Sequence, residues 1–330
     1  MYLEFVHNNL ILWYSEINIS SRTERWQPMK KEFYFPSKDG MTQIHALEWI
    51  PEGTPKAILQ IAHGMVEHIE RYHDFAAYLA SNGIYVTGHS HLGHGKSMIS
   101  KEKMGYFAAP NGNECVIGDI HELRKLTQKK YPDVPYFLMG HSMGSFLTRQ
   151  YLGKHAEGLS GAIIMGTGEQ PDLILAGGKL VCKIIAAFKG WEHRSDFVNS
   201  LVIGGFEKEM GKGWLSKNEE NVKTYAADPL SGFVFTLNAF YHMFDGMSKM
   251  NASEKNGRFP KELPIFFVAG SEDPVGAHGK GVETVYQRYL EKGAKNAKIK
   301  LYADDRHEIL NELDKDVVYE DLLKWILANI

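Results

Sequence analysis

The chain has 330 residues, of which 44% are hydrophobic, and its 37 basic and 40 acidic residues give a formal net charge of −3. A chain of this length and composition can bury a sizeable core, so it is not expected to be disordered. The well-mixed charges provide no basic field for a phosphate backbone, which excludes nucleic acid as an expected partner.

The first 28 residues differ in pattern from the rest of the chain. Residues 1–28 contain Glu4, lack a basic start and carry only a broken apolar patch, so they make a poor signal peptide. Regular β patterning begins at Met29, and we expect the preceding residues to be an extension outside the core fold. No apolar run reaches the roughly 18 to 20 residues of a membrane span. The only two cysteines, Cys115 and Cys182, match no zinc or redox spacing, which predicts free thiols and a cytoplasmic location.

Strand and helix patterns alternate along the remaining chain. Two strands at residues 32–36 and 43–50, joined by Lys38-Asp39-Gly40, predict an antiparallel hairpin. Further strands are expected at residues 57–62, 84–88, 134–139, 161–165, 264–269 and 297–302, and helices at residues 72–82, 118–130, 145–155, 281–292 and 316–328. This alternation predicts an α/β fold with a mostly parallel central sheet and helices on both faces.

A long segment separates two of the predicted strands. About a hundred residues follow the strand at 161–165 before the next strand begins, far more than a crossover helix needs. Helical spacing at residues 173–188 and 233–247 predicts an inserted helical cap, in which most large apolar side chains pack and a minority face substrate. The expected organisation is an extension (1–28), a first core part (29–168), the cap (169–261) and a second core part (262–330).

The pentapeptide Gly140-His141-Ser142-Met143-Gly144 lies between an apolar strand and a helix. A Gly-x-Ser-x-Gly motif in that context predicts a nucleophile elbow, a sharp turn with Ser142 at its tip, where glycines remove clashes with the neighbouring backbone. The motif alone is only moderately specific, because an ordinary turn serine gives the same pattern. A serine hydroxyl is a weak nucleophile at neutral pH, so this prediction requires a base and an acid elsewhere in the chain.

Both partners occur after predicted strands in the order that the elbow requires. Asp273 follows the strand at 264–269 and is the predicted acid, with Glu272 as the next best carboxylate. His307 follows the last strand and is the predicted general base. The backbone N–H groups of Met65, after an early strand, and of Met143, after the nucleophile, are the expected oxyanion hole.

Further motifs extend this pattern to a family resemblance. The chain carries His63-Gly64-Met65-Val66-Glu67-His68, then Arg71-Tyr72, and later Gly93-His94-Gly95-Lys96-Ser97. Together with the pentapeptide and its two partners, these motifs resemble the monoacylglycerol lipase and lysophospholipase branch of the serine α/β-hydrolases, which is similar to the S33 serine aminopeptidases. The resemblance covers nearly everything from Phe33 onward. It implies the α/β-hydrolase fold and no cofactor.

The same motifs contain one departure and several alternatives. Ser90 stands where similar enzymes usually have Asp, from which we expect altered local hydrogen bonding. His89, His91 and His94 lack a carboxylate or cysteine at ligand spacing, so no metal is expected. The Gly93-x-Gly95 stretch lacks the other residues of a dinucleotide fingerprint.

A neutral, apolar cap without a basic cluster suits hydrolysis of a lipid-like carboxylic ester, through an acyl-enzyme on Ser142. Monoacylglycerols and lysophospholipids are the expected substrates, and the cap is expected to contact membrane surfaces transiently. The sequence leaves open an amidase or aminopeptidase and an acyltransferase that use the same residues. It also leaves open a ligand-binding protein with negligible turnover.

Glu67 and His68 are expected either to brace the oxyanion loop or to form an ordinary surface pair.

Overall fold

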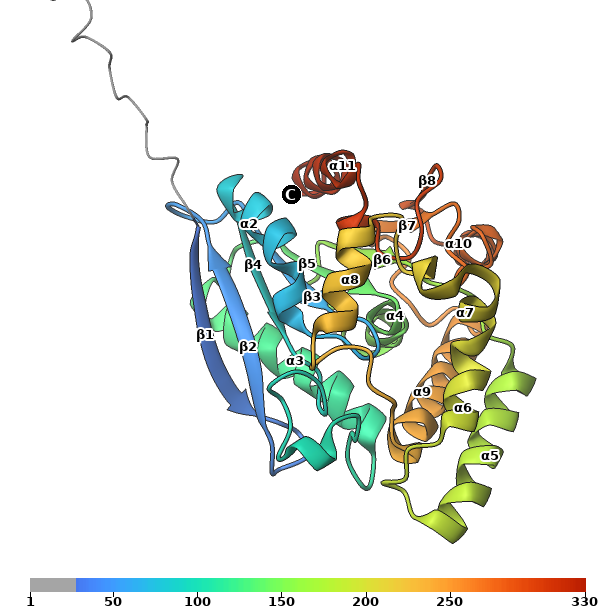
Figure 1. The fold of residues 1–330 in the computed structure, drawn as a ribbon. Coiled ribbons are helices and arrows are strands. Elements are labelled where there is room, and N and C mark those ends of the chain that lie inside the picture. Colours follow the sequence, from blue (N-terminus) through green and yellow to red (C-terminus); the bar gives the residue numbers. More distant parts are fainter. Residues whose placement is uncertain (1–27) are drawn as a thin grey trace, which may run out of the picture.

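An eight-stranded, mostly parallel sheet forms the centre of the computed structural model, which describes residues 28–330 (Figure 1). Its strands are β1 (Met29–Pro36), β2 (Gln43–Ile50), β3 (Ala57–Ala62), β4 (Ile84–His89), β5 (Tyr136–His141), β6 (Gly161–Met165), β7 (Ile265–Gly270) and β8 (Ala297–Tyr302). They are arranged in the order β1-β2-β4-β3-β5-β6-β7-β8. The predicted extension lies outside the described residues, except for its last residue.

The opening hairpin is antiparallel, and the rest of the sheet is parallel. β1 pairs with β2, and β2 also runs antiparallel to β4. All other neighbouring strands, from β4 to β8, run parallel to one another. The carboxyl ends of β3, β5, β7 and β8 therefore lie at the same edge of the sheet, where ligands bind in open α/β sheets.

Helices cover both faces of this sheet (Figure 1). The longer ones are α2 (His73–Ser81), α3 (Gly112–Lys130), α4 (Met143–His155), α5 (Asp172–Lys189), α6 (Asp196–Val202), α7 (Gly204–Met210), α8 (Glu219–Ala227), α9 (Leu237–Lys255), α10 (Lys280–Glu291) and α11 (Lys315–Leu327). Short 3-10 helices are η1 (Ile69–Tyr72), η2 (Lys101–Lys103), η3 (Gly211–Trp214) and η4 (Ile309–Asn311). The predicted α/β class with a mostly parallel sheet is thus confirmed.

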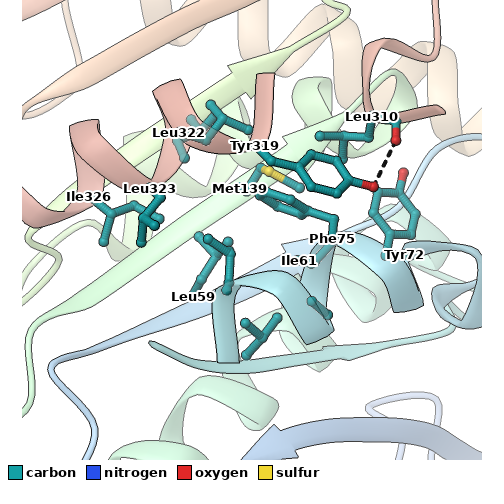
Figure 2. Close-up of a cluster of buried hydrophobic side chains, with 14 of the residues drawn as sticks. Leu59, Ile61, Tyr72, Phe75, Met139, Leu310, Tyr319, Leu322, Leu323 and Ile326 are labelled. Carbon is teal, nitrogen blue, oxygen red and sulfur yellow. Dashed lines mark hydrogen bonds between the residues drawn. The ribbon is translucent and has the colours of Figure 1, made fainter. Parts of the chain in front are cut away.

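Alternate residues of the buried strands supply the two sides of the core. In β7, Phe266 packs on the side of α2 and α11, while Phe267 packs on the side of α10. Figure 2 shows the α2–α11 side, where Phe75 and Tyr319 lie against each other with ring centroids 5.0 Å apart. The Tyr319 hydroxyl donates to the Leu310 carbonyl at 3.0 Å, so the one polar atom of this ring is satisfied.

The segment between β6 and β7 contains α5 to α9. The first long helix agrees with the helical spacing at 173–188. The second begins later than the spacing indicated, because residues 233–235 are not helical and Thr236, in an extended conformation, caps α9 by accepting from the Ala239 N–H. α9 packs against α3 and α4 of the core as well as against α5.

The start of α3 also differs from its prediction. The helix begins at Gly112 rather than at Gly118, although Asn111-Gly112-Asn113 favours a turn by local propensity. Asn113 is buried and donates through its side-chain amide to Gln150 Oε1 at 3.0 Å. This long-range contact extends the helix through residues that propensity alone assigns to a loop.

Candidate active site

Ser142 lies between β5 and α4 in a backbone conformation that few residues other than glycine adopt, with φ 53° and ψ −120°. Its N–H donates to the Met165 carbonyl at 3.0 Å. Its carbonyl accepts from the N–H and the hydroxyl of Ser145, at 2.8 and 2.6 Å. These bonds hold the strained turn, which is the geometry of a nucleophile elbow.

The two glycines of the pentapeptide are required by close backbone approach. A β-carbon at Gly140 would collide with the carbonyl of Gly144, and one at Gly144 would collide with the carbonyl of Ala62 at the end of β3. The first turn of α4 therefore passes directly over the ends of β3 and β5. Any larger residue at either position would push Ser142 out of place.

His307 and Asp273 lie together in the interior. Nδ1 of His307 is 3.0 Å from both carboxylate oxygens of Asp273, and both side chains are buried. A carboxylate only accepts, so Nδ1 carries the proton and Nε2 keeps its lone pair. The alternative acid, Glu272, is half-exposed and lies 3.6 Å from Lys217 instead. The structure therefore pairs the predicted base with Asp273.

One cavity of about 930 Å³ collects the predicted site residues. Ser142, His307, Met65 and Met143 all line it, and most of its wall is apolar. Within residues 28–330, no hydrogen bond joins the Ser142 hydroxyl to His307, although both side chains face the same cavity. Asp273 lies outside the cavity wall, behind the imidazole.

The two predicted oxyanion donors come from the loop after β3 and from the first turn of α4. Neither the Met65 N–H nor the Met143 N–H donates a hydrogen bond to a loop or turn carbonyl in the described part of the chain. Met143 is the first residue of α4, where backbone N–H groups have no partner within the helix. Both donors are therefore available at the cavity wall.

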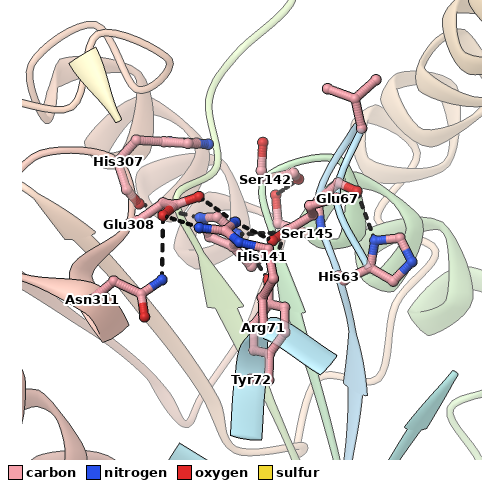
Figure 3. A network of polar contacts seen from close by, with 12 residues as sticks. His63, Glu67, Arg71, Tyr72, His141, Ser142, Ser145, His307, Glu308 and Asn311 are labelled. Atoms are coloured by element: carbon pink, nitrogen blue, oxygen red, sulfur yellow. Dashed lines mark hydrogen bonds and ion pairs between the residues drawn. The ribbon is translucent and has the colours of Figure 1, made fainter. Parts of the chain in front are cut away.

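A polar network lies beneath the elbow and joins it to the oxyanion loop (Figure 3). One oxygen of Glu67, Oε1, accepts from the Gly64 N–H at 2.5 Å and from the Tyr72 hydroxyl at 2.8 Å. Nδ1 of His141 lies 3.0 Å from the Tyr72 oxygen and 3.3 Å from the same carboxylate oxygen. Glu67 thus braces the loop after β3 that carries Met65, the predicted oxyanion loop, whereas His68 pairs with Asp228 at 2.6 Å.

The network continues from Glu67 to the residue after His307. Arg71 Nη1 donates to Glu67 Oε2 at 2.7 Å, and the same guanidinium makes two bonds to Glu308. Asn221 of α8 donates to Glu308 Oε2 at 2.7 Å. The guanidinium therefore joins the oxyanion loop, the loop that carries His307 and the segment between β6 and β7.

This network favours the protonated form of His141. Burial alone would lower its pKa, but the hydrogen bond and the charge of Glu67 outweigh burial and raise the pKa of His141 above its usual value. Burial would raise the pKa of Glu67, and its contacts with His141 and Arg71 lower it instead. Nε2 of His141 lies 3.1 Å from the His307 carbonyl and donates to it. Both ring nitrogens are thus used as donors.

The histidine tract after β4 forms a buried aromatic group around His63. His63 and His91 have ring centroids 4.1 Å apart, and His63 Nε2 accepts from the His91 N–H at 2.8 Å. Both nitrogens of the His89 ring and the Ser90 hydroxyl have no hydrogen-bond partner among the described residues. Within residues 28–330, no group of three or more acidic, His or Cys side chains is placed to hold a metal ion.

Several residues of the site were not singled out from the sequence. In the sequence, His141 is only a variable position of the pentapeptide, Glu308 carries no signal, and Trp214 is one of many large apolar side chains of the predicted cap. Tyr225 of α8 was also missed; its hydroxyl donates to the Val66 carbonyl at 3.2 Å. The signal in the sequence was weak, because each acts through contacts with residues far away along the chain.

The fold and the elbow define an α/β-hydrolase. The sheet order, the strained serine after β5 and the buried Asp–His pair after β7 and β8 are those of this class. None of the helices in residues 28–330 has both the length and the apolar character needed to cross a membrane.

Comparisons with known proteins place the chain within this class. Residues 53–314 match the model of the serine aminopeptidase S33 family, Hydrolase_4, and the chain belongs to that family. It is 27% identical over 321 residues to the monoglyceride lipase of Rattus norvegicus, covering 96% of each chain.

Solved structures agree with this placement. A carboxyl esterase from Bacillus coagulans is 30% identical with a TM-score of 0.83, covering 91% of this chain and 98% of that one. A monoglyceride lipase from Saccharomyces cerevisiae is 18% identical and shares the fold, with a TM-score of 0.73 over 93% of this chain and 98% of that one. The chain is a carboxylic ester hydrolase.

Proposed function

We propose that the chain hydrolyses monoacylglycerols or lysophospholipid-type lipid esters through an acyl-enzyme on Ser142. The observation that carries this proposal is a cavity of about 930 Å³, lined mainly by apolar side chains, onto which both Ser142 and His307 open. A substrate with one acyl chain and a small head group needs an apolar slot that ends at the nucleophile. The activity named for the rat and yeast relatives supports the same substrate class.

In the proposed reaction, Ser142 Oγ attacks the ester carbonyl carbon while His307 Nε2 takes the hydroxyl proton. Asp273 accepts the Nδ1–H bond of the imidazole and stabilises its positive charge. The negative oxygen of the tetrahedral intermediate accepts from the N–H groups of Met65 and Met143. Collapse of the intermediate breaks the carbon–alkoxide bond, and the alcohol leaves with the proton from Nε2.

Water completes the cycle. His307 Nε2 takes a proton from the water molecule as its oxygen attacks the acyl carbon, and then returns that proton to Ser142 Oγ as the fatty acid leaves. Because each step uses the same proton site and the same oxyanion donors, removal of Ser142 abolishes both acylation and deacylation. An acyltransferase would replace this water with a second alcohol.

The buried carboxylates near the nucleophile favour a neutral ester over a peptide with a free amino terminus. Glu67 and Glu308 both line the cavity, but Arg71 bridges them, and its charge together with that of a protonated His141 offsets their two negative charges. Asn221 and Tyr72 use further lone pairs of these carboxylates. Neither carboxylate is therefore free to bind a substrate ammonium group, as an aminopeptidase would require.

We propose that residues 169–261 act as a cap that docks on a lipid surface. Large apolar side chains of α5 and α6 are exposed to solvent, with Leu173 83% and Phe188 87% exposed. Others on these two helices are Ile174, Leu180, Ile184, Phe197 and Leu201. Leu173, Ile174 and Leu201 also line the cavity, so the exposed apolar face continues into the substrate site.

The two buried, free cysteines support a reducing, cytoplasmic compartment.

A substrate panel tests the proposed function. Wild-type protein and Ser142→Ala are compared on 1-lauroylglycerol, lauroyl-lysophosphatidylcholine and alanine 4-nitroanilide. We expect fatty acid release from a lipid ester and a loss of at least about 10³-fold in Ser142→Ala. Faster cleavage of the anilide would favour an aminopeptidase, and product formation that requires an added alcohol would favour an acyltransferase. Binding without turnover would contradict an enzymatic role.

A further inference from the structure

One aromatic side chain of the segment between β6 and β7 lies against the proposed general base. Trp214 is the last residue of η3, and its ring centroid lies 5.2 Å from that of His307 at an interplanar angle of 39°. Trp214 also contacts Phe206 of α7, at 5.4 Å between centroids. All three rings line the cavity. This contact brings the indole within the range of an attractive aromatic pair with the imidazole.

The backbone on both sides of this ring pair is fixed as well. The Gly213 carbonyl accepts from Arg306 Nη1 at 2.7 Å. The Leu215 carbonyl accepts from the Glu308 N–H at 2.8 Å. The residues before and after the indole are therefore bonded to the residues before and after the imidazole.

A buried carboxylate adds a third connection. Glu312 is only 2% exposed and accepts from the Ser216 hydroxyl at 2.9 Å and from the Lys217 N–H at 3.0 Å. It also accepts from the Arg306 N–H at 3.0 Å. One side chain thus binds the segment after Trp214 to the loop that carries the base. These hydrogen bonds hold the backbone on both sides of Trp214 against the loop that carries His307. They therefore fix the position of the indole relative to the imidazole.

Two other groups face the imidazole directly. Asp273, after β7, accepts from its Nδ1, and the His141 ring of the elbow lies 4.7 Å away between centroids. The carboxylates of Glu67 and Glu308 and the guanidinium of Arg71 lie around His141. A second cation beside the protonated His141 is disfavoured, so a neighbour that stabilises the imidazolium has a role to fill.

We propose that Trp214 is a positioning residue for His307, which keeps the imidazole directed toward Ser142 and stabilises the imidazolium that forms during the reaction. The proposal rests on the proposed function. When the Ser142 oxygen bonds to the acyl carbon, its proton moves to Nε2, and the new cation lies beside the π electrons of the indole. Its charge returns to zero when the leaving alcohol takes the proton.

The pH profile separates this role from simple covering of the imidazole. An indole that attracts the imidazolium favours the charged form of the base, whereas an indole that only excludes water disfavours it. Removal of the indole therefore moves the acidic limb of kcat/KM to lower pH in the first case and to higher pH in the second.

The experiment measures hydrolysis of 4-nitrophenyl butyrate by the full chain. In Trp214→Leu we expect kcat to fall about 10-fold with little change in KM, and the acidic limb to move down by about half a pH unit. Trp214→Phe retains an aromatic ring and stays within about threefold of the wild type. Trp191→Leu makes the same change outside the cavity, where Trp191 contacts Tyr241, and leaves the profile unchanged.

A wild-type kcat in Trp214→Leu overturns the proposal. So does an acidic limb of the pH profile that is unshifted or moves to higher pH in that variant. If that variant does not fold, Trp214→Met fills the site with a flexible apolar chain and is judged by the same criteria. Fluorophosphonate labelling of Ser142 is measured in every protein. Labelled variants with the wild-type profile overturn only the role of Trp214, whereas a wild-type chain that neither labels nor hydrolyses the ester overturns the proposed function.

Discussion

Arg71 forms a two-bond ion pair with Glu308, with Nη1 2.6 Å from Oε1 and Nη2 2.7 Å from Oε2. The two residues are 237 positions apart, and Glu308 directly follows the predicted base. The same guanidinium holds Glu67, which bonds the oxyanion loop. One cation therefore fixes the loop after β3 and the loop that carries His307 at the separation that the proposed reaction requires.

Removal of this cation is expected to destabilise the fold strongly. Arg71→Met leaves two buried carboxylates without their cation, and we expect the free energy of unfolding to fall by about 3 to 5 kcal/mol. Lys96→Met is the control, because Lys96 bridges the more exposed Glu32 and Glu70 and is expected to cost at most about 1 kcal/mol. Urea unfolding at pH 7 measures both. Equal losses in the two variants would contradict the account of the network.

Stability that comes from His141 is expected to disappear at alkaline pH. The pKa of His141 is raised in the folded state, so its contribution is fully present below the unfolded value of about 6.5 and is lost as pH rises through the folded value. The difference in unfolding free energy between wild type and His141→Gln should therefore be larger at pH 6 than at pH 9. A difference that grows toward pH 9 would show that His141 is neutral in the folded protein.

The buried histidine at the end of β4 is expected to limit stability in acid. Burial lowers the pKa of His89 to about 3, while the unfolded chain binds the proton near pH 6.5. Stability is therefore lost as pH falls below about 6.5, and this one group accounts for about 3 kcal/mol at pH 4. The imidazole of His89 makes no hydrogen bond among the described residues, so His89→Leu should cost little at pH 7. Between pH 7 and pH 4, urea titrations should show a smaller loss of unfolding free energy in His89→Leu than in the wild type. Equal losses in the two proteins would refute this.

The exposed face of α5 and α6 is expected to matter only for substrate held in a lipid surface. The double variant Phe188→Asp, Phe197→Asp removes two exposed rings that do not line the cavity. We expect about 10-fold slower hydrolysis of monoacylglycerol in phosphatidylcholine vesicles and an unchanged rate on 4-nitrophenyl butyrate, because each ring loses about 1 kcal/mol or more of interfacial burial. Leu313→Asp is the control, because Leu313 is also exposed but lies outside α5 and α6, between η4 and α11. Equal rates on vesicles for all three proteins would refute the docking surface.

The local signals in the sequence were sufficient for the sheet and for the elbow. β6 and β7 are continuous apolar runs, whereas the edge strand β8 alternates apolar residues with lysines, and Gly140 and Gly144 mark a turn that no side chain fits. Helix starts were less predictable. Ser195 and Asn218 accept from the first turns of α6 and α8, and their capping role was not recognised among many polar residues.

The contacts beneath the site could not be predicted, for a physical reason. Arg71 and Glu308 each follow a familiar motif, but nothing local indicates that they pair. Trp214 lies in a segment with weak helical periodicity, and only the folded chain brings it to His307. Such pairings depend on how the loops at the carboxyl edge of the sheet are placed, and no period or propensity encodes that placement.

The proposed reaction depends above all on Ser142 as the nucleophile, activated by His307 and Asp273. Its most direct test is mass spectrometry of the chain after reaction with a fluorophosphonate probe, followed by peptide mapping. We expect one adduct, on the peptide that contains Ser142, absent in Ser142→Ala and formed at least about 10²-fold more slowly in His307→Ala. An adduct on another residue, or undiminished labelling in either variant, would contradict the account.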